Sequence, residues 1–325
     1  MPAISETRFQ MVQLVFPEHT NAFGTLFGGR MMAWIAVAGT LTASRVARGP
    51  VVLGAMDDLD FLTPVHLGEI VTIDAQVEYI GRSSLEVGVE VSSEPARGGG
   101  RRRTTSSHLA FVALDEHERP RPVGQRIVPG SPDEEEVYAA ASARKAARRE
   151  RVGALGPGAG ALPEGGTRHG LQIARLVMPE DALSGTLMFA GKLLGTLDEV
   201  AAIVASRYCR GPVVTASIDT VYFFHPLRVG EIADIRAALT HVGRSSMEIG
   251  VQVASEQPQS GLRRHTCTAF LTMVHLDEHG RPAPVPPFTP ETPEEAHLFA
   301  AGEARSRLRR ARVARVRGMA HRDAG

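Results

Sequence analysis

The sequence predicts an α+β protein in which one domain occurs twice in tandem. Three observations predict this: a repeat with a domain-sized period, one long apolar helix in each repeat, and strand-like segments that follow each helix. The length of 325 residues suits two domains of ordinary size. One long helix packed on an antiparallel sheet is an α+β layer arrangement, because each element buries its apolar face on the other.

The repeat is seen as a constant offset between matching segments. Residues 81–86 read GRSSLE, and residues 243–248, which lie 162 positions later, read GRSSME. The same offset pairs residues 49–52 with 211–214 (both GPVV) and residues 68–70 with 230–232 (both GEI). A shared register over roughly 110 residues excludes chance, and a period of this length indicates a duplicated domain rather than a solenoid.

Each repeat has the same order of elements. We expect a first strand at residues 8–16 and 170–177, a glycine-containing loop, and then a buried helix at residues 30–47 and 192–209. The helical runs are rich in Ala, Met and Leu and are apolar nearly all round, which is typical of a buried helix. Strands are expected at residues 70–77, 85–91 and 107–114, and at 232–239, 247–253 and 266–276.

The predicted domains are residues 5–123 and 167–287, and a charged helix follows each of them. These helices, residues 131–152 and 289–317, begin with acidic residues and end with basic ones, which matches the helix macrodipole. Residues 153–166 (GALGPGAGALPEGG) are expected to form a flexible linker. The sequence leaves open whether the charged helices cover the sheets or make contacts between subunits.

The composition excludes several classes of protein. Basic and acidic residues number 36 each, so no overall field favours nucleic acid or membrane. The two cysteines, Cys209 and Cys267, belong to no metal-ligand pattern, so neither a zinc site nor a disulfide framework is expected. The sequence has no signal-peptide pattern and no apolar stretch long enough to span a bilayer, so we expect a cytoplasmic protein.

Three segments, PEHTNAFGTLFGGRMMAW, RGPVVLGAMDDLDFLTPVHLGE and GRSSLEVGVEV, resemble the hot-dog-fold acyl-CoA thioesterases. The second repeat resembles them equally well, and the whole chain is similar to the cytosolic acyl-CoA hydrolases that carry two hot-dog domains. The resemblance implies that a long central helix is wrapped by an antiparallel sheet and that the two domains pair as a pseudo-dimer. It also implies hydrolysis of acyl-CoA to fatty acid and CoA at the domain boundary, and a homo-oligomer such as a trimer of double hot-dogs.

The two copies differ at two polar positions, and the differences are complementary. Asn21 in the first loop aligns with Leu183, whereas Asp198 in the second helix aligns with Ala36. The resemblance places a catalytic Asn in this loop and a catalytic Asp in this helix. It therefore implies one composite site, in which Asn21 of domain 1 and Asp198 of domain 2 activate water.

Further residues are assigned to the thioester and to CoA. We expect the glycines before each helix (Gly28, Gly29 and Gly191) to bring backbone N–H groups close to the thioester oxygen. Arginine and serine side chains suit phosphate, and the resemblance assigns residues 82–84 and 244–246 to the binding of CoA. The CoA-binding candidates are Arg82, Ser83, Ser84, Arg244, Ser245 and Ser246, together with Thr215, which aligns with Leu53.

Some alternatives stay open at this point. Glu199 could be the working carboxylate, and His19 beside the asparagine could act as a base, although a surface position is expected for it. The fold alone also permits a non-catalytic acyl-CoA sensor or a hot-dog hydratase or dehydratase. No cofactor and no metal are expected, since CoA is part of the substrate.

Overall fold

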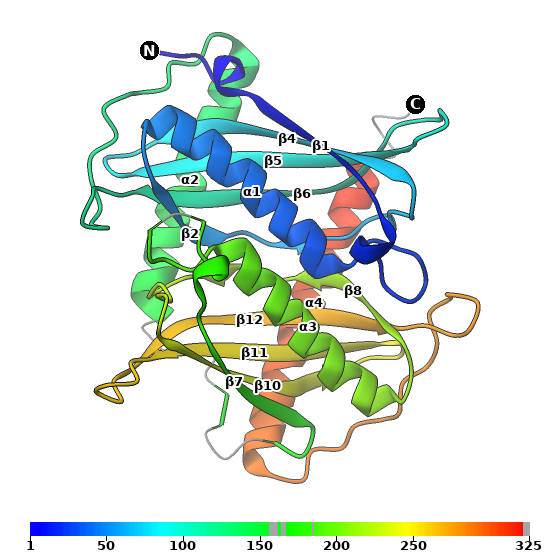
Figure 1. The fold of residues 1–325 in the computed structure, drawn as a ribbon. Helices are drawn as coiled ribbons and strands as arrows, with labels where there is room; N and C mark the ends of the chain where they lie inside the picture. Colours follow the sequence, from blue (N-terminus) through cyan, green and yellow to red (C-terminus); the bar gives the residue numbers. More distant parts are fainter. Residues whose placement is uncertain (156–161, 164–166, 184, 321–325) are drawn as a thin grey trace.

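The computed structural model describes residues 1–155, 162–163, 167–183 and 185–320, which form two six-stranded sheets and four α-helices (Figure 1). The helices are α1 (Gly28–Ala47), α2 (Pro132–Leu155), α3 (Ala190–Cys209) and α4 (Pro293–Ala320). Short 3-10 turns lie at Ser5–Thr7, Pro17–His19 and Pro179–Asp181. The strands of the first half are β1 (Phe9–Leu14), β2 (Val51–Met56), β3 (Leu59–Asp60), β4 (Glu69–Ile80), β5 (Ser84–Pro95) and β6 (Arg102–Ala113). Those of the second half are β7 (Gly170–Leu176), β8 (Val213–Ile218), β9 (Val221–Tyr222), β10 (Ile232–Val242), β11 (Ser246–Glu256) and β12 (Arg263–His275).

Each domain is a long central helix held on an antiparallel sheet, as the α+β prediction requires. The helices begin at Gly28 and Ala190, two residues earlier than expected, and both end at an arginine in the left-handed conformation, Arg48 and Arg210. A Gly-Pro pair follows each arginine, and proline cannot continue a helix. Figure 1 shows α1 and α3 side by side at the centre of the molecule.

The two sheets exchange short strands, which the sequence did not predict. Their strand orders are β1-β4-β5-β6-β2-β9 and β3-β8-β12-β11-β10-β7, so β3 of domain 1 extends the sheet of domain 2, and β9 of domain 2 extends that of domain 1. We call the β3–β8 boundary the first seam and the β2–β9 boundary the second seam. One continuous core crosses both domains, and it includes Leu59 of β3 and Val221 of β9, neither of which is exposed.

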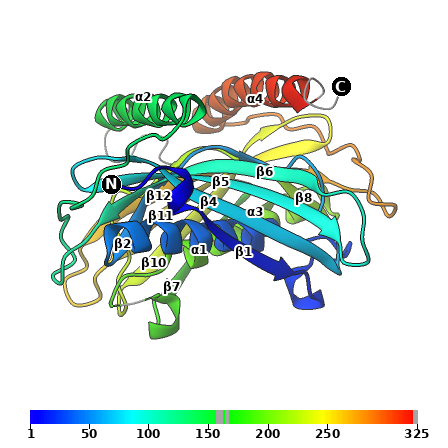
Figure 2. The same ribbon diagram turned by 90° about the horizontal axis from the view of Figure 1, so that it is seen from above.

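The charged helices cover the outer faces of the sheets. Figure 2 shows α2 and α4 on the side of the sheets opposite to α1 and α3. Alternate residues of β5 and β11 face α1 and α3, and the residues between them face the outer helices. Two of these outward residues, Glu86 and Glu248, are only 1% exposed, because Arg148 of α2 and Arg305 of α4 bind their carboxylates.

The segment between the domains is partly helical. Helix α2 continues to Leu155, so its last turn occupies the first three residues of the expected linker. Residues 156–161 and 164–166 of that linker lie outside the described residues. Leu162 is buried against domain 2, and its N–H donates to Gln252 Oε1 at 2.9 Å. Among the described helices, none is long and apolar enough to cross a membrane.

Candidate active site

Asp198 is a fully buried carboxylate in the middle of α3. Its Oδ2 accepts a hydrogen bond from the backbone N–H of Gly29 at 2.6 Å, and its Oδ1 accepts one from the hydroxyl of Thr215 at 2.6 Å. Burial raises the pKa of Asp198 to about 6, against the lowering effect of these two hydrogen bonds, and the charge of Glu199 raises it further. The site therefore holds a carboxylate that changes its protonation near neutral pH, as a general base does.

Residues of both domains contribute to this site. Gly29 lies at the start of α1 in domain 1, whereas Asp198 and Thr215 belong to α3 and β8 of domain 2. The N-terminus of α1 points its free N–H groups and its positive dipole end toward a negative group. The bond from Gly29 to Asp198 therefore joins the domains through the favourable end of a helix.

A cavity of about 590 Å³, which we call the large cavity, lies beside Asp198 at the first seam. Gly28 and Thr215 line it and also lie close to the carboxylate, so Asp198 sits directly behind this part of the wall. The lining is mostly apolar, with a few polar groups, which is the usual composition of a small-molecule site. The lining includes Asn21, Phe23, Thr25, Met31, Phe61, Thr63, His66, Ala202, Val213, Val214, Ala216, Glu278 and His279.

The loop before α1 holds Asn21 in a fixed orientation. Its Oδ1 accepts hydrogen bonds from the N–H groups of Phe23 and Thr25, at 2.9 and 3.2 Å, and from the hydroxyl of Thr25 at 3.0 Å. Because the oxygen is occupied, the side chain offers its Nδ2 amide to the cavity. This amide is a hydrogen-bond donor and cannot take a proton.

The three glycines assigned to the thioester have different positions. Gly28 lines the large cavity, and a Cβ added there would come within 2.8 Å of Thr215 and 3.1 Å of Asp198 Oδ2. Gly29 uses its N–H for Asp198 and so does not offer it to a substrate. Gly191 lies at the start of α3, where a Cβ would contact Phe189 and the backbone of Ala33. Of the three, the structure brings only Gly28 to the cavity.

Residues 82–84 and 244–246, predicted to bind CoA, lie in the hairpins between β4 and β5 and between β10 and β11. Neither segment lines the large cavity. The second segment is close to it, because the Ser245 carbonyl accepts from the N–H of His275 at 3.0 Å and the next residue, Leu276, lines the cavity. Thr215, which we expected to bind CoA, lines the large cavity and donates its hydroxyl to Asp198.

The two alternative catalytic groups are placed elsewhere. Glu199 is exposed on α3 and points away from the buried side on which Asp198 lies. His19 accepts a hydrogen bond from the N–H of Phe16 at 3.2 Å, and its ring packs edge-on against Trp34. Neither residue lines the large cavity.

The second seam carries the corresponding cavity without counterparts of the Asn21, Asp198 and Thr215 side chains. This small cavity measures about 220 Å³ and is lined by Leu183, Leu53 and Ala190, at the positions of Asn21, Thr215 and Gly28. Ala36, at the position of Asp198, is buried. This arrangement has no carboxylate to accept a proton at the helix.

An ion pair further distinguishes the second seam. Glu118 lines the small cavity, pairs with Arg228, and accepts from the hydroxyl of Thr186 at 2.8 Å. At the first seam the corresponding positions are Gly280 and His66, which line the large cavity. The smaller cavity is therefore bordered by the Glu118–Arg228 ion pair, whereas Gly280 and His66 at the corresponding positions form no such pair in the described part of the chain.

Several lining residues escaped the sequence analysis. Thr25, which fixes Asn21, aligns with Leu187, so the same comparison of the copies could have found it. Phe61 and His66 follow the crossing strand β3 and reach the site of domain 2 only because of that crossing. Glu278 and His279 lie in a turn, and no pattern in the sequence points to them.

Comparisons with known proteins agree with this architecture. The model of the thioesterase superfamily matches residues 23–99 and 185–262, once in each domain. The cytosolic acyl coenzyme A thioester hydrolase of Mus musculus is 30% identical over 309 residues, which are 91% of this chain and 81% of that protein. The uncharacterized acyl-CoA thioester hydrolase YkhA of Bacillus subtilis is 39% identical over 145 residues, 45% of this chain and 84% of that protein.

Among solved structures, an acyl-CoA hydrolase from Bacillus cereus is 35% identical, with a TM-score of 0.44, and covers 46% of this chain and 91% of its own. The match to the relative from Mus musculus extends over nearly the whole chain, and the family model occurs once in each half. The chain belongs to the thioesterase superfamily, as a member with two hot-dog domains in tandem.

Proposed function

We propose that this protein hydrolyses acyl-CoA thioesters to a fatty acid and CoA at one composite site, formed at the first seam by Asn21 of domain 1 and Asp198 of domain 2. The observation that carries the proposal is the buried Asp198 carboxylate, which is bound to the helix N-terminus of the other domain and lies behind the wall of the large cavity. A buried carboxylate without a cationic partner is costly, and its presence in α3 but not in α1 supports a chemical role.

In the proposed reaction each group has one step, which its position supports. Water attacks the thioester carbonyl carbon while the Asp198 carboxylate takes a proton from it. The Gly28 N–H and the Asn21 Nδ2 donate hydrogen bonds to the oxygen that becomes negative in the tetrahedral intermediate. The C–S bond then breaks, and the proton held by Asp198 passes to the CoA thiolate, which restores the carboxylate.

For the CoA nucleotide we propose residues 244–246 rather than residues 82–84. The first of these segments is bonded to the strand that leads to Leu276 at the large cavity, whereas the carbonyl of Ser83 accepts from Ala113 beside Leu114 of the small one. The guanidinium of Arg244 is exposed and suits a phosphate. Arg244→Ala should raise KM with little change in kcat, and Arg82→Ala should leave both unchanged.

The relatives support this reaction class, since their names describe hydrolysis of acyl-CoA thioesters. The relative from Mus musculus is cytosolic by name, in agreement with the cytoplasmic location expected from the sequence. A trimer of double hot-dogs stays a prediction, to be tested by light scattering of the purified protein. The preferred acyl chain length is to be read from a profile of hydrolysis across acyl-CoAs.

The proposal is tested by release of free thiol from acyl-CoAs of several chain lengths. Asp198→Ala and Asn21→Ala should each lower kcat by about 100-fold or more, because each removes a group used in the chemical step. The matched controls are Ala36→Ser and Leu183→Ala at the second seam, which should stay near the wild-type rate.

Each outcome of this assay has a distinct meaning. Near-full activity of Asp198→Ala would overturn the composite site. Tight binding of acyl-CoA without thiol release would indicate a sensor instead of an enzyme. Addition of water to an enoyl-CoA without thiol release would indicate a hydratase.

A further inference from the structure

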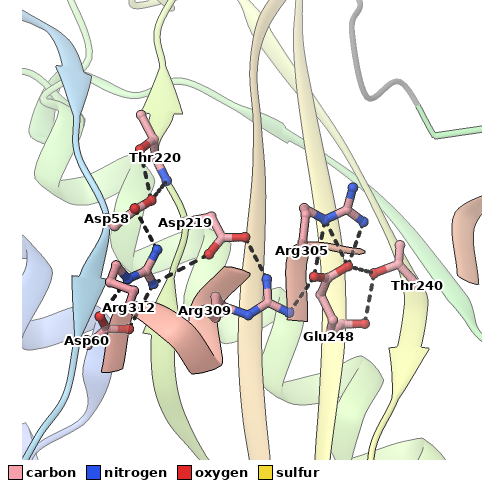
Figure 3. Close-up of polar contacts among 9 residues, drawn as sticks. All are labelled: Asp58, Asp60, Asp219, Thr220, Thr240, Glu248, Arg305, Arg309 and Arg312. Atoms are coloured by element: carbon pink, nitrogen blue, oxygen red, sulfur yellow. Dashed lines mark hydrogen bonds and ion pairs between the residues drawn. The ribbon is translucent and has the colours of Figure 1, made fainter. Parts of the chain in front are cut away.

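The outer helix α4 carries a row of three arginines that ends at the first seam (Figure 3). Arg305 and Arg309 bind acids of domain 2. Arg305 donates to Glu248 at 2.6 Å, and Arg309 donates to Asp219 at 2.6 Å and lies 2.6 Å from Glu248. Arg312, one helical turn further on, also binds acids of domain 1.

Arg312 joins the two domains. Its Nε and Nη2 donate to the two carboxylate oxygens of Asp60, at 2.7 and 2.8 Å, and its Nη1 lies 2.5 Å from Asp58. Its Nη2 also lies 3.7 Å from Asp219 of domain 2. Asp58 in turn accepts from the N–H and the hydroxyl of Thr220, at 2.7 and 2.9 Å. A bidentate pair of this kind fixes geometry as well as adding energy.

These acids adjoin two walls of the large cavity. Asp60 ends β3, and the next residue, Phe61, lines the cavity and donates its N–H to Ala216 of β8 at 2.9 Å. Asp219 directly follows β8, of which residues 213–216 line the cavity from the side of domain 2. Arg312 therefore contacts residues at the ends of the β3 and β8 walls and lies outside the cavity lining.

We call the contacts of Arg312 with Asp58, Asp60 and Asp219 the clamp. The second seam lacks such a clamp in the part of the chain that the structure describes. Arg148 of α2 binds Glu86 and Asp57 of its own domain. Its counterpart on α4 is Arg309, which binds the equivalent acids of domain 2. Arg151, three residues further along α2, is exposed. The residues aligned with Asp58 and Asp60 are a threonine and a tyrosine, at positions 220 and 222. In the described residues, the clamp is thus present at the seam that holds Asp198 and the large cavity.

We propose that Arg312 is a positioning residue for the hydrolysis: by binding Asp58 and Asp60 it holds β3 on β8 and sets the two cavity walls at the spacing that the thioester requires. The inference rests on the proposed function of the first seam. Thr215 lies in the β8 wall and its hydroxyl holds Asp198, so a shift of β8 reaches the carboxylate. A displacement of about 1 Å of the reacting groups can lower the rate by up to ~100-fold, so a small shift of the walls should be measurable.

The clamp can be tested without any reaction. Hydrogen exchange of the full chain should become faster in residues 59–66 and 213–218 when Arg312→Ala removes the clamp. The matched control is Arg151→Ala on α2, which should leave exchange unchanged in residues 51–56 and 221–224. Asp60→Asn keeps the size of the side chain and should reproduce the effect of Arg312→Ala on exchange. It provides the test if Arg312→Ala folds poorly. Unchanged exchange in both first-seam variants would overturn the clamp.

The kinetic test uses kcat/KM for an acyl-CoA between pH 5 and 9. Arg312→Ala should lower kcat/KM by about tenfold or more. It should also move the acidic limb of the pH profile to higher pH, because loss of the Thr215 hydrogen bond raises the pKa of Asp198. Thr215→Val should move the limb the same way. Arg312→Lys should recover part of the activity, and Arg151→Ala should match wild type.

A purely structural role would give a different result. Glu199 adjoins Asp198, and His66, Glu278 and His279 line the cavity; in the described residues none of these contacts Arg312. Asp219 contacts Arg312 but does not line the cavity. If Arg312→Ala only lowers Tm and leaves the acidic limb in place, the positioning role is overturned. If exchange responds but Asp198→Ala stays active, the clamp stands and the composite site fails.

Discussion

The two seams of this protein are built on the same backbone and differ in a few side chains. The first seam has Asn21, Gly28, Asp198 and Thr215 around a cavity of about 590 Å³. The second has leucine or alanine at all four positions around a cavity of about 220 Å³. Duplication alone would give two equal sites, so the differences mark the groups that the proposed chemistry would use.

The comparison also shows what a buried carboxylate needs in this fold. Both helices begin at a seam and point N–H groups across it, so the second seam still offers the donor of Gly191. What it lacks is the hydroxyl of Thr215, which Leu53 replaces. An ionised group with one donor instead of two is poorly compensated, and an alanine at position 36 avoids that cost.

The largest effect is expected from placing a carboxylate in the second seam. Ala36→Asp should lower the free energy of unfolding by about 3 kcal/mol at pH 8. Urea unfolding at pH 8 and pH 5 measures this. The loss should shrink as pH falls, because burial raises the pKa of such a group and protonation removes the buried charge.

The partner of this substitution is Leu53→Thr, which would supply the missing hydroxyl. In a double-mutant cycle the two changes should show a favourable coupling of about 1 kcal/mol. An Ala36→Asp variant as stable as wild type, with no coupling, would mean that the hydroxyl is not what allows the carboxylate at the first seam.

An exchange of glycine and alanine at the start of each helix should have different consequences at the two seams. Gly28→Ala puts a Cβ within 2.8 Å of Thr215 and 3.1 Å of Asp198 Oδ2, so the contact between these two residues must shift. We expect kcat/KM to fall by about 10- to 100-fold. Ala190→Gly, the matched change at the second seam, should leave kcat/KM within about twofold of wild type, apart from a small loss of helix stability. Equal effects at both seams would show that the second seam takes part in the reaction.

The repeat and the helices could be predicted from the sequence because their signals are local or periodic. A constant offset needs no structure, and an apolar run of helical length identifies α1 and α3. The two-residue strands β3 and β9 could not be predicted, because so short a strand has no period and its partner belongs to the other domain. The strand exchange therefore became visible only in three dimensions.

The site was predictable where the copies differ and not where they agree. Asn21 and Asp198 stand out because their counterparts are apolar. Gly28 differs from Ala190 in the same way, whereas Gly29 and Gly191 are identical and give no signal. The hydrogen-bond partner of Asp198 could not be predicted in this way. The alignment marks position 215 as different, but only the fold brings the Thr215 hydroxyl to the Asp198 carboxylate.

The pH dependence of the first seam should follow Asp198. With a pKa of about 6, kcat/KM should be constant well above this pH and fall about tenfold per unit below it, because only the carboxylate accepts a proton. Glu199→Gln should move the midpoint to slightly lower pH, since the charge of Glu199 raises the pKa of Asp198 and is screened by water. A midpoint that does not respond to Glu199→Gln at low salt would indicate that another group controls the acidic limb.

The smallest effect is expected at the ion pair beside the small cavity. Glu118 and Arg228 are partly exposed, with side-chain exposures of 22% and 42%, so their pair adds little to stability. Glu118→Gln should lower the free energy of unfolding by less than about 1 kcal/mol and leave kcat/KM unchanged, because no step of the proposed reaction uses the second seam. Thermal unfolding and thiol release on the same preparation measure both. A change in kcat/KM without a change in stability would mean that the small cavity binds part of the substrate, and that the two seams differ in degree rather than in kind.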